Sequence, residues 1–340
     1  MLVQRVARFL RRQFLPVGLV IVAVAGILYP APGRYMAGLP TQNIAVSVIF
    51  VCAGLRLRTD EIRKALAAWS ATLWGSLSIL LVTPFVGTFL ASRVPVAEEF
   101  QLGLALFFCM PTTLSSGIAL TGQARGNNAL ALLLTVLSNV AGVFTMPFVL
   151  ERLLGFLGHV ELSATDLLFR LCISILIPLA AGKVLRLFWR DWVNANQTGI
   201  GLLSNLALII VPWMEFSQSS ERLLQIAVVS LLILILAGMG VHVVFLAING
   251  LAARILLLEP AESRAVVLLA SQKTLPVALT VLAFLPIPAE AKGLVAIPCV
   301  TSHLGQILID AHVATRWSNT RVADPQLECV RDTASSQVTS

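Results

Sequence analysis

Long apolar runs separated by short polar stretches fill most of the chain. A helix that crosses the hydrocarbon core of a bilayer needs about 20 apolar residues, because each residue advances the helix by about 1.5 Å. Eight runs without charge and two that carry charges approach or exceed this length. They cover residues 13–33, 35–55, 65–92, 100–124, 126–150, 167–188, 192–214, 223–253, 265–289 and 293–309. The pattern predicts an all-α polytopic membrane protein with ten transmembrane helices.

The composition supports this prediction. Of the 340 residues, 57% are apolar and 12% are charged, whereas a soluble domain carries about 25% charged residues. The mean hydropathy is +0.88. The side chains are therefore too apolar to cover a water-facing globule, and a soluble enzyme is excluded. The net charge of +7 is spread thinly at the ends of apolar runs, so it indicates membrane loops, with no nucleic-acid partner.

Motifs for enzymatic or metal chemistry are absent from the sequence. It has no HExxH and no GxSxG motif, and its five cysteines show no paired spacing. We therefore predict a protein that is not an enzyme and has no cofactor.

The positions of lysine and arginine predict the orientation. With the N-terminus inside, 17 of them fall on the inner side and 6 on the outer side, which favours ten spans with both termini cytoplasmic in the plasma (inner) membrane. Residues 1–12 form a basic cytoplasmic N-terminus, followed by a retained first span. Residues 13–313 form the transporter domain, and the polar residues 314–340 form a disordered cytoplasmic tail.

The fourth and ninth runs are interrupted in the same manner. Pro111 lies eleven residues after Phe100, and Pro276 lies eleven residues after Ala265. Five crossings separate the two runs, so a five-helix repeat (about 13–155 and 160–313) is inverted, as in secondary transporters. We expect discontinuous helices 4 and 9 to cross. The alternative is two simple proline kinks whose freed carbonyls are satisfied by nearby hydroxyls.

Dense polar residues accompany both breaks and are the candidate substrate- or ion-binding residues. They are Thr112, Thr113, Ser115 and Ser116 in the fourth run and Ser271, Gln272, Lys273 and Thr274 in the ninth. Asn127, at the start of the fifth run, either caps that helix or offers an amide oxygen to a cation.

Lys273 is the most informative single residue. It lies nine residues beyond Arg264, which places it about 13 Å deep in a core about 30 Å thick. An ammonium group there is expected to face a cavity, carbonyl oxygens or an anion. The alternative is a structural lysine held by Thr112 or Ser116. We expect no carboxylate at this depth, because Glu215 and Asp310 fall near the ends of their runs.

The sequence resembles the bile acid:sodium symporter family. The resemblance rests on FLPVGL, IFVCAGLRLRTDEI, CMPTTLSSGIALT, the Gly126-Asn127 pair and SQKTLP, and covers about residues 10–315. It is greatest to the branch of solute-carrier family 10 member seven and its fungal calcium-homeostasis relatives. The resemblance implies two inverted five-helix repeats, a panel domain and a core domain with two crossing broken helices.

The resemblance also implies a sodium site. Ser115 or Ser116, Asn127 and Gln272 match positions that bind sodium in sodium-coupled relatives, but the acidic residue expected before Gln272 is missing. Sodium coupling is therefore not favoured, since a nearby ammonium would add repulsion of about 4 kcal/mol at about 4 Å. Lys273 would instead replace the cation, exchange protons between alternating states, or contact an anionic solute directly.

Two functional hypotheses follow. The first is a secondary transporter that moves a small, anionic organic solute across the lipid bilayer by alternating access. Sodium and protons are its candidate coupling ions, and sodium is not favoured. The alternative is a membrane regulator of calcium homeostasis that transports no organic solute.

Overall fold

The computed structural model describes residues 14–57, 68–113, 115–157 and 162–319. Within these ranges the regular secondary structure is entirely helical, as the apolar runs predict. The helices are α2 (Phe14–Leu28), α3 (Pro30–Ala37), α4 (Thr41–Arg56), α6 (Trp69–Leu77), α7 (Thr83–Ala91), α8 (Glu98–Phe108), α9 (Ser116–Gln123), α10 (Asn128–Leu157), α11 (Ala164–Leu171), α12 (Ile177–Phe188), α13 (Arg190–Ala195), α14 (Gln197–Gln218), α15 (Ser220–Leu223), α16 (Val228–Ile255), α17 (Pro260–Ser271), α18 (Leu275–Phe284) and α19 (Ala289–Asn319). Two π-helical turns, η1 (Ser78–Val82) and η2 (Cys172–Leu176), join α6 to α7 and α11 to α12.

Seven of the described helical segments are long and apolar enough to cross a membrane. The pair α2 and α3, bent by 98° at Tyr29, makes an eighth if it is one span. Two predicted spans do not meet the length on their own: α4 has 16 residues, and the fourth run is divided into α8 and α9. The chain is thus an integral membrane protein whose described helices provide seven or eight spans by length and composition.

The C-terminal boundary of the transmembrane domain differs from the prediction. The polar composition predicts a disordered tail from residue 314, but α19 continues to Asn319 and Ala314 is fully buried. The rest of the predicted tail and the N-terminal residues 1–12 lie outside the described residues.

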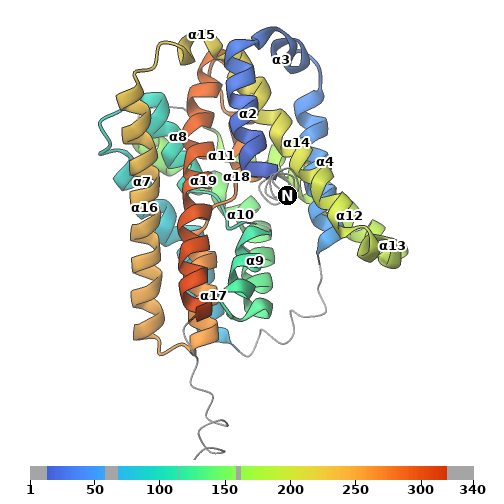
Figure 1. Cartoon of the computed structure of the whole chain (residues 1–340), viewed down its shortest axis with the longest axis vertical. Coiled ribbons are helices and arrows are strands. Elements are labelled where there is room, and N and C mark those ends of the chain that lie inside the picture. The colour runs from blue at the N-terminus through green and yellow to red at the C-terminus, as the bar shows by residue number, and fades with distance from the viewer. Residues whose placement is uncertain (1–13, 58–67, 114, 158–161, 320–340) are drawn as a thin grey trace, which may run out of the picture.

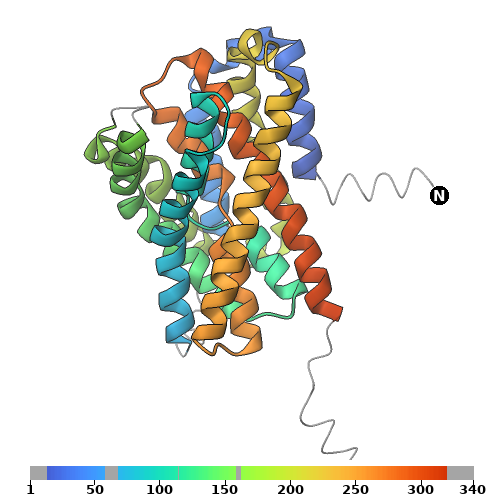
Figure 2. The same ribbon diagram turned by 90° about the vertical axis from the view of Figure 1, so that its left-hand side faces the viewer.

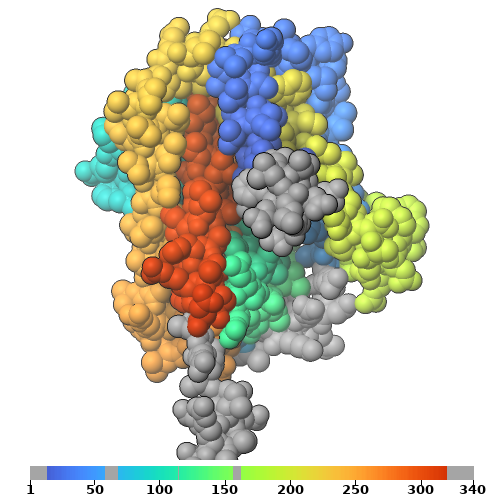
Figure 3. Space-filling view, viewed as in Figure 1, coloured from blue at the N-terminus to red at the C-terminus, as the bar shows by residue number. Residues whose placement is uncertain are grey.

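The helices pack in two bundles (Figure 1). In the first bundle, α4 packs on α12, and α14 packs on α2, α3 and α4. In the second bundle, α19 packs on α8 and α16, while α17 packs on α16, α6, α9 and α10. Figure 2 shows α16 and α17 side by side, and Figure 3 shows α16 next to α19 on the surface. The bundles meet mainly where α14 packs on α19.

Glycine permits the closest contact within the first bundle. A Cβ atom at Gly54 of α4 would lie 2.1 Å from the carbonyl oxygen of Leu179, and one at Gly182 of α12 would lie 2.1 Å from that of Val51. The two backbones therefore touch directly, as small residues allow in membrane helices.

The ninth apolar run, which contains Lys273, lies at the centre of the molecule. Almost every residue from Ala265 to Leu282, in α17 and α18, is buried, whereas most residues of α16 are exposed or half-buried. Exposed apolar side chains such as Leu232, Leu236 and Val243 cover the outer surface of α16, which suits contact with lipid. Lys273 is thus enclosed by other helices rather than by lipid.

Candidate functional site

The fourth run is interrupted as the sequence predicts. Helix α8 ends at Phe108 and α9 begins at Ser116, with Pro111 between them. Proline has no N–H group to donate and its ring obstructs a continuing helix. Thr112 and Thr113, directly after it, are buried.

The ninth run is also interrupted. Helix α17 ends at Ser271, Gln272 adopts an extended conformation, and α18 begins at Leu275. Pro276 lies in the first turn of α18, where a helix has no partner for an N–H group. The proline therefore starts the second half-helix rather than kinking a continuous one.

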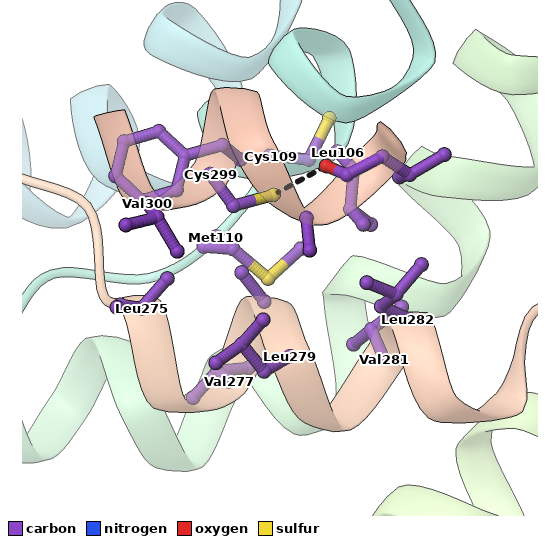
Figure 4. Close-up of a cluster of buried hydrophobic side chains, with 14 of the residues drawn as sticks. Leu106, Cys109, Met110, Leu275, Val277, Leu279, Val281, Leu282, Cys299 and Val300 are labelled. Atoms are coloured by element: carbon purple, nitrogen blue, oxygen red, sulfur yellow. Dashed lines mark hydrogen bonds between the residues drawn. The ribbon is translucent and has the colours of Figure 1, made fainter. Parts of the chain in front are cut away.

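The two breaks contact each other. The N–H group of Thr274 donates to the carbonyl oxygen of Pro111 at 3.0 Å, and the hydroxyl of Thr112 donates to the carbonyl oxygen of Leu269 at 2.5 Å. Each segment thus supplies a backbone carbonyl oxygen that accepts a hydrogen bond from the other. On the apolar side, Met110 lies between Leu279 of α18 and Cys299 of α19 (Figure 4).

A cavity of about 580 Å³ lies between the two bundles, beside these breaks. Of the predicted residues, Thr113, Ser115, Ser116, Thr274 and Pro276 line it. The first bundle contributes side chains of α2, α4, α12 and α14. The sequence singles out these hydroxyl-bearing residues beside the two breaks. It does not identify the cavity residues of the first bundle, because most of them are apolar and their few amide side chains are scattered along the sequence.

The cavity lining has little charge. Among its described residues Arg56 carries the only full charge, and it is exposed at the end of α4. His303 also lines the cavity and is 4% exposed. No carboxylate belongs to the described lining. The lining therefore suits an anion better than a cation.

Lys273 does not line the cavity. Its side chain is fully buried, and Nζ donates to the carbonyl oxygen of Ile79 at 2.9 Å. Ile79 belongs to η1, a π-helical turn, where the regular helical bonding pattern is altered. The sequence predicts that the ammonium group faces a cavity, carbonyl oxygens or an anion, and in the structure it donates to a carbonyl oxygen. The side chain of Lys273 forms no hydrogen bond with Thr112 or Ser116, which are both among the described residues.

The backbone at Lys273 is held by Gln306 of α19. The N–H group of Lys273 donates to Oε1 of Gln306 at 2.9 Å, and Nε2 of Gln306 donates to the carbonyl oxygen of Lys273 at 2.6 Å. One amide side chain thus satisfies both polar groups of an unwound residue.

The expectation that no carboxylate lies near the breaks is wrong. Asp310 is fully buried, and its carboxylate accepts a hydrogen bond from Nε2 of Gln272 at 2.6 Å. It was placed near a segment end because the apolar run stops at residue 309, but α19 continues to Asn319. The missed signal is that residues 306–319 contain neither glycine nor proline, so nothing marks the end of the helix there.

Asp310 is part of a buried polar chain. Nε2 of His242 lies 2.8 Å from Oδ1 of Asp310, and Nδ1 of His242 lies 3.2 Å from the carbonyl oxygen of Ser271. A carbonyl oxygen only accepts, so Nδ1 carries the hydrogen. At the other end, the hydroxyl of Thr113 donates to Oε1 of Gln272 at 2.6 Å. This series of hydrogen bonds connects Thr113 in the cavity wall to His242 of α16.

The three residues matched to a sodium site are engaged differently. Oδ1 of Asn127 accepts from the N–H group of Leu130 at 3.0 Å, which is the capping role. Gln272 is held between Thr113 and Asp310, whereas Ser116 lines the cavity. Both oxygens of Asp310 already face nitrogen atoms, which does not suit a metal ion.

Known proteins resemble this chain over nearly its whole length. It is 37% identical over 322 residues to the "Probable sodium/metabolite cotransporter BASS4, chloroplastic" of Oryza sativa subsp. indica, which covers 91% of this chain and 76% of that protein. The protein of the same name from Arabidopsis thaliana is 38% identical over 321 residues, covering 91% of this chain and 73% of that protein. The "Sodium/bile acid cotransporter 7-B" of Xenopus laevis is 26% identical over 310 residues, covering 88% of this chain and 90% of that protein.

These relatives are named as transporters rather than enzymes, in agreement with the two contacting helix breaks and the cavity beside them. The model of the SBF-like CPA transporter family matches residues 13–319. The chain therefore belongs to the SBF-like CPA transporter family.

Proposed function

We propose that this protein is a secondary transporter that carries a small organic anion across the membrane by alternating access. The observation that carries the proposal is the cavity between the two bundles, which both helix breaks line and in which Arg56 supplies the only full charge among the described lining residues. Binding sites beside broken helices are typical of secondary transporters. The names of two relatives, a sodium/metabolite cotransporter and a sodium/bile acid cotransporter, describe the transport of organic solutes.

The proposal includes the ten-span topology. The described segments that contain α2–α3, α4, α6–α7, α8–α9, α10, α11–α12, α14, α16, α17–α18 and α19 supply one span each. They form two inverted five-helix repeats, with both termini cytoplasmic in the plasma (inner) membrane. The breaks in spans four and nine support this arrangement, since they occupy the same place in each repeat.

Coupling to protons is favoured over coupling to sodium. Asn127, Gln272 and Asp310 each have a hydrogen-bond partner that occupies the oxygen a sodium ion would need. Lys273, whose ammonium group donates to the neutral carbonyl oxygen of Ile79, is the group that would release or bind a proton as the bundles move. Its ammonium group would then replace a bound metal ion.

Uptake into proteoliposomes tests the proposal. Purified protein is reconstituted, and uptake of taurocholate and of short mono- and dicarboxylates is measured with an inward sodium gradient, an inward proton gradient, or neither. We expect uptake of at least one anion above that of protein-free vesicles, faster with the proton gradient. Equal rates with and without that gradient contradict proton coupling, and no uptake of any anion contradicts the transporter proposal.

A further inference from the structure

Ser219 and Gly293 join the two bundles at a second place, away from the cavity. Ser219 follows α14 and is 1% exposed, and Gly293 is buried near the start of α19. The N–H group of Gly293 donates to the hydroxyl oxygen of Ser219 at 2.8 Å. The same hydroxyl donates to the carbonyl oxygen of Ala289 at 3.4 Å. One side chain of the first bundle therefore bonds twice to the backbone of α19.

The contact leaves no room for a side chain at residue 293. A Cβ atom there would lie 2.4 Å from the hydroxyl oxygen and 2.5 Å from Cβ of Ser219. It would also lie 2.7 Å from the carbonyl oxygen of Glu215. Because the last of these is backbone, only a movement of α14 relative to α19 could relieve the overlap.

This junction and the cavity lie at different heights along the same two helices. On α14 the cavity is lined by residues from Gln197 to Leu208, and on α19 by His303 and Ile307. Ser219 is eleven residues beyond Leu208, which corresponds to about 16 Å of helix. Ser219 directly precedes α15, which lies at the top of Figure 1.

The cavity meets solvent at its other end. Arg56, Gly122 and Asn128 line it and are exposed, whereas Glu215, Ser219 and Ser220 at the junction are at most 2% exposed. The structure is thus closed at the junction and open beside Arg56.

A buried carboxylate at the junction opposes closure. Oε1 of Glu215 accepts from Nε2 of Gln42 at 2.8 Å, but Oε2 is buried with no hydrogen-bond partner among the described residues. A buried acceptor without a partner is unfavourable, and it would regain water if the helices separated. The close contact at Gly293 favours the closed arrangement and Glu215 favours the open one, so the two states can lie close in free energy.

We propose that the Ser219–Gly293 junction is the gate that closes the solute cavity at the end away from Arg56. The inference rests on the proposed function, since alternating access requires this end to open when the Arg56 end closes. Gly293 sets how closely α14 and α19 approach, and Ser219 holds them together.

Cysteine labelling from each side of the membrane tests the gate without any solute. Ser204 of α14 lines the cavity, and Ser204→Cys is the reporter, labelled by a membrane-impermeant charged maleimide in proteoliposomes of determined orientation. Mass spectrometry of the peptide that carries residue 204 separates it from the native cysteines. We expect labelling from the Arg56 side in the parent, and a shift on the order of tenfold toward the opposite side when Gly293→Ala is added.

Two further variants make the result decisive. Gly305→Ala, on the same helix, meets only the flexible side chain of Met239 and should leave the labelling unchanged. Ser219→Ala removes the hydroxyl without adding bulk, so it should shift the labelling in the same direction by a smaller factor even if Gly293→Ala does not fold. Unchanged labelling in folded Gly293→Ala or Ser219→Ala, or an equal shift in Gly305→Ala, overturns the gate. A shift in labelling without uptake of any tested anion would instead contradict the proposed function alone.

Discussion

The N–H group of Thr274 donates to the carbonyl oxygen of Pro111 at 3.0 Å, so the two helix breaks, far apart in the chain, are hydrogen-bonded to each other. Each break exposes backbone polar groups that lipid cannot satisfy. Because the breaks satisfy each other, unwound backbone is stable at the centre of a membrane protein. Hydroxyl-bearing residues beside the two bonded breaks line the cavity.

Gln306 is expected to stabilise the ninth-run break. Gln306→Leu removes the partners of both backbone groups of Lys273, and buried groups left without a partner cost about 1–3 kcal/mol each. The free energy of unfolding in detergent should therefore fall by about 3 kcal/mol. Gln123→Leu, which removes an exposed bond to Thr315, is the matched control and should change stability by about 0.5 kcal/mol or less. Equal losses in the two variants would show that Gln306 has no special role.

Asp310 should be replaceable by asparagine but not by alanine. Asp310→Ala leaves Nε2 of Gln272 and Nε2 of His242 without partners in a buried site and should destabilise the protein by about 3–5 kcal/mol. Asp310→Asn retains an oxygen for Gln272 and offers an N–H group to Nε2 of His242, so it should cost less than about 1.5 kcal/mol. Denaturant unfolding in detergent measures both. A loss in the asparagine variant as large as that in the alanine variant would contradict the hydrogen-bond assignment.

Gly182 is expected to tolerate no side chain. Gly182→Ala places a methyl group against the backbone of Val51, and such overpacking costs about 1–3 kcal/mol. Gly199→Ala, inside α14 with no atom within 4 Å of its Cβ position, should instead stabilise the protein by about 0.5–1 kcal/mol. Melting temperatures of the two variants should therefore move in opposite directions. A melting temperature of Gly182→Ala at or above that of the parent would show that α4 and α12 are not so close.

Arg56 is expected to contribute to the binding of an anionic solute. It is exposed, so the interaction is screened and worth about 1 kcal/mol. Arg56→Gln should then raise the KM for the transported anion about fivefold, with the maximal rate little changed. Arg93→Gln is the control, because Arg93 is exposed and stacks on Phe89 away from the cavity lining. An unchanged KM in Arg56→Gln would place the charge recognition elsewhere.

The sequence determined where the helices are and where two of them break. Apolar runs identify segments that must satisfy their own backbone in lipid. Pro111 and Pro276, each accompanied by several polar residues, mark the two breaks. The sequence also identifies the hydroxyl-bearing residues beside the breaks as candidate binding residues, and several of them line the cavity.

Only the tertiary structure decided which groups meet. Lys273 bonds to Ile79 and Asp310 bonds to Gln272, and neither pairing is visible in sequence, because partners distant in the chain have no fixed spacing. The sequence pattern puts Asp310 at the end of a span because a charged residue ends the apolar run. The helix nevertheless continues past Asp310, because its backbone hydrogen bonds continue and the carboxylate finds buried partners. The pattern of residues therefore fixes local structure, and packing between helices decides which polar groups share a partner.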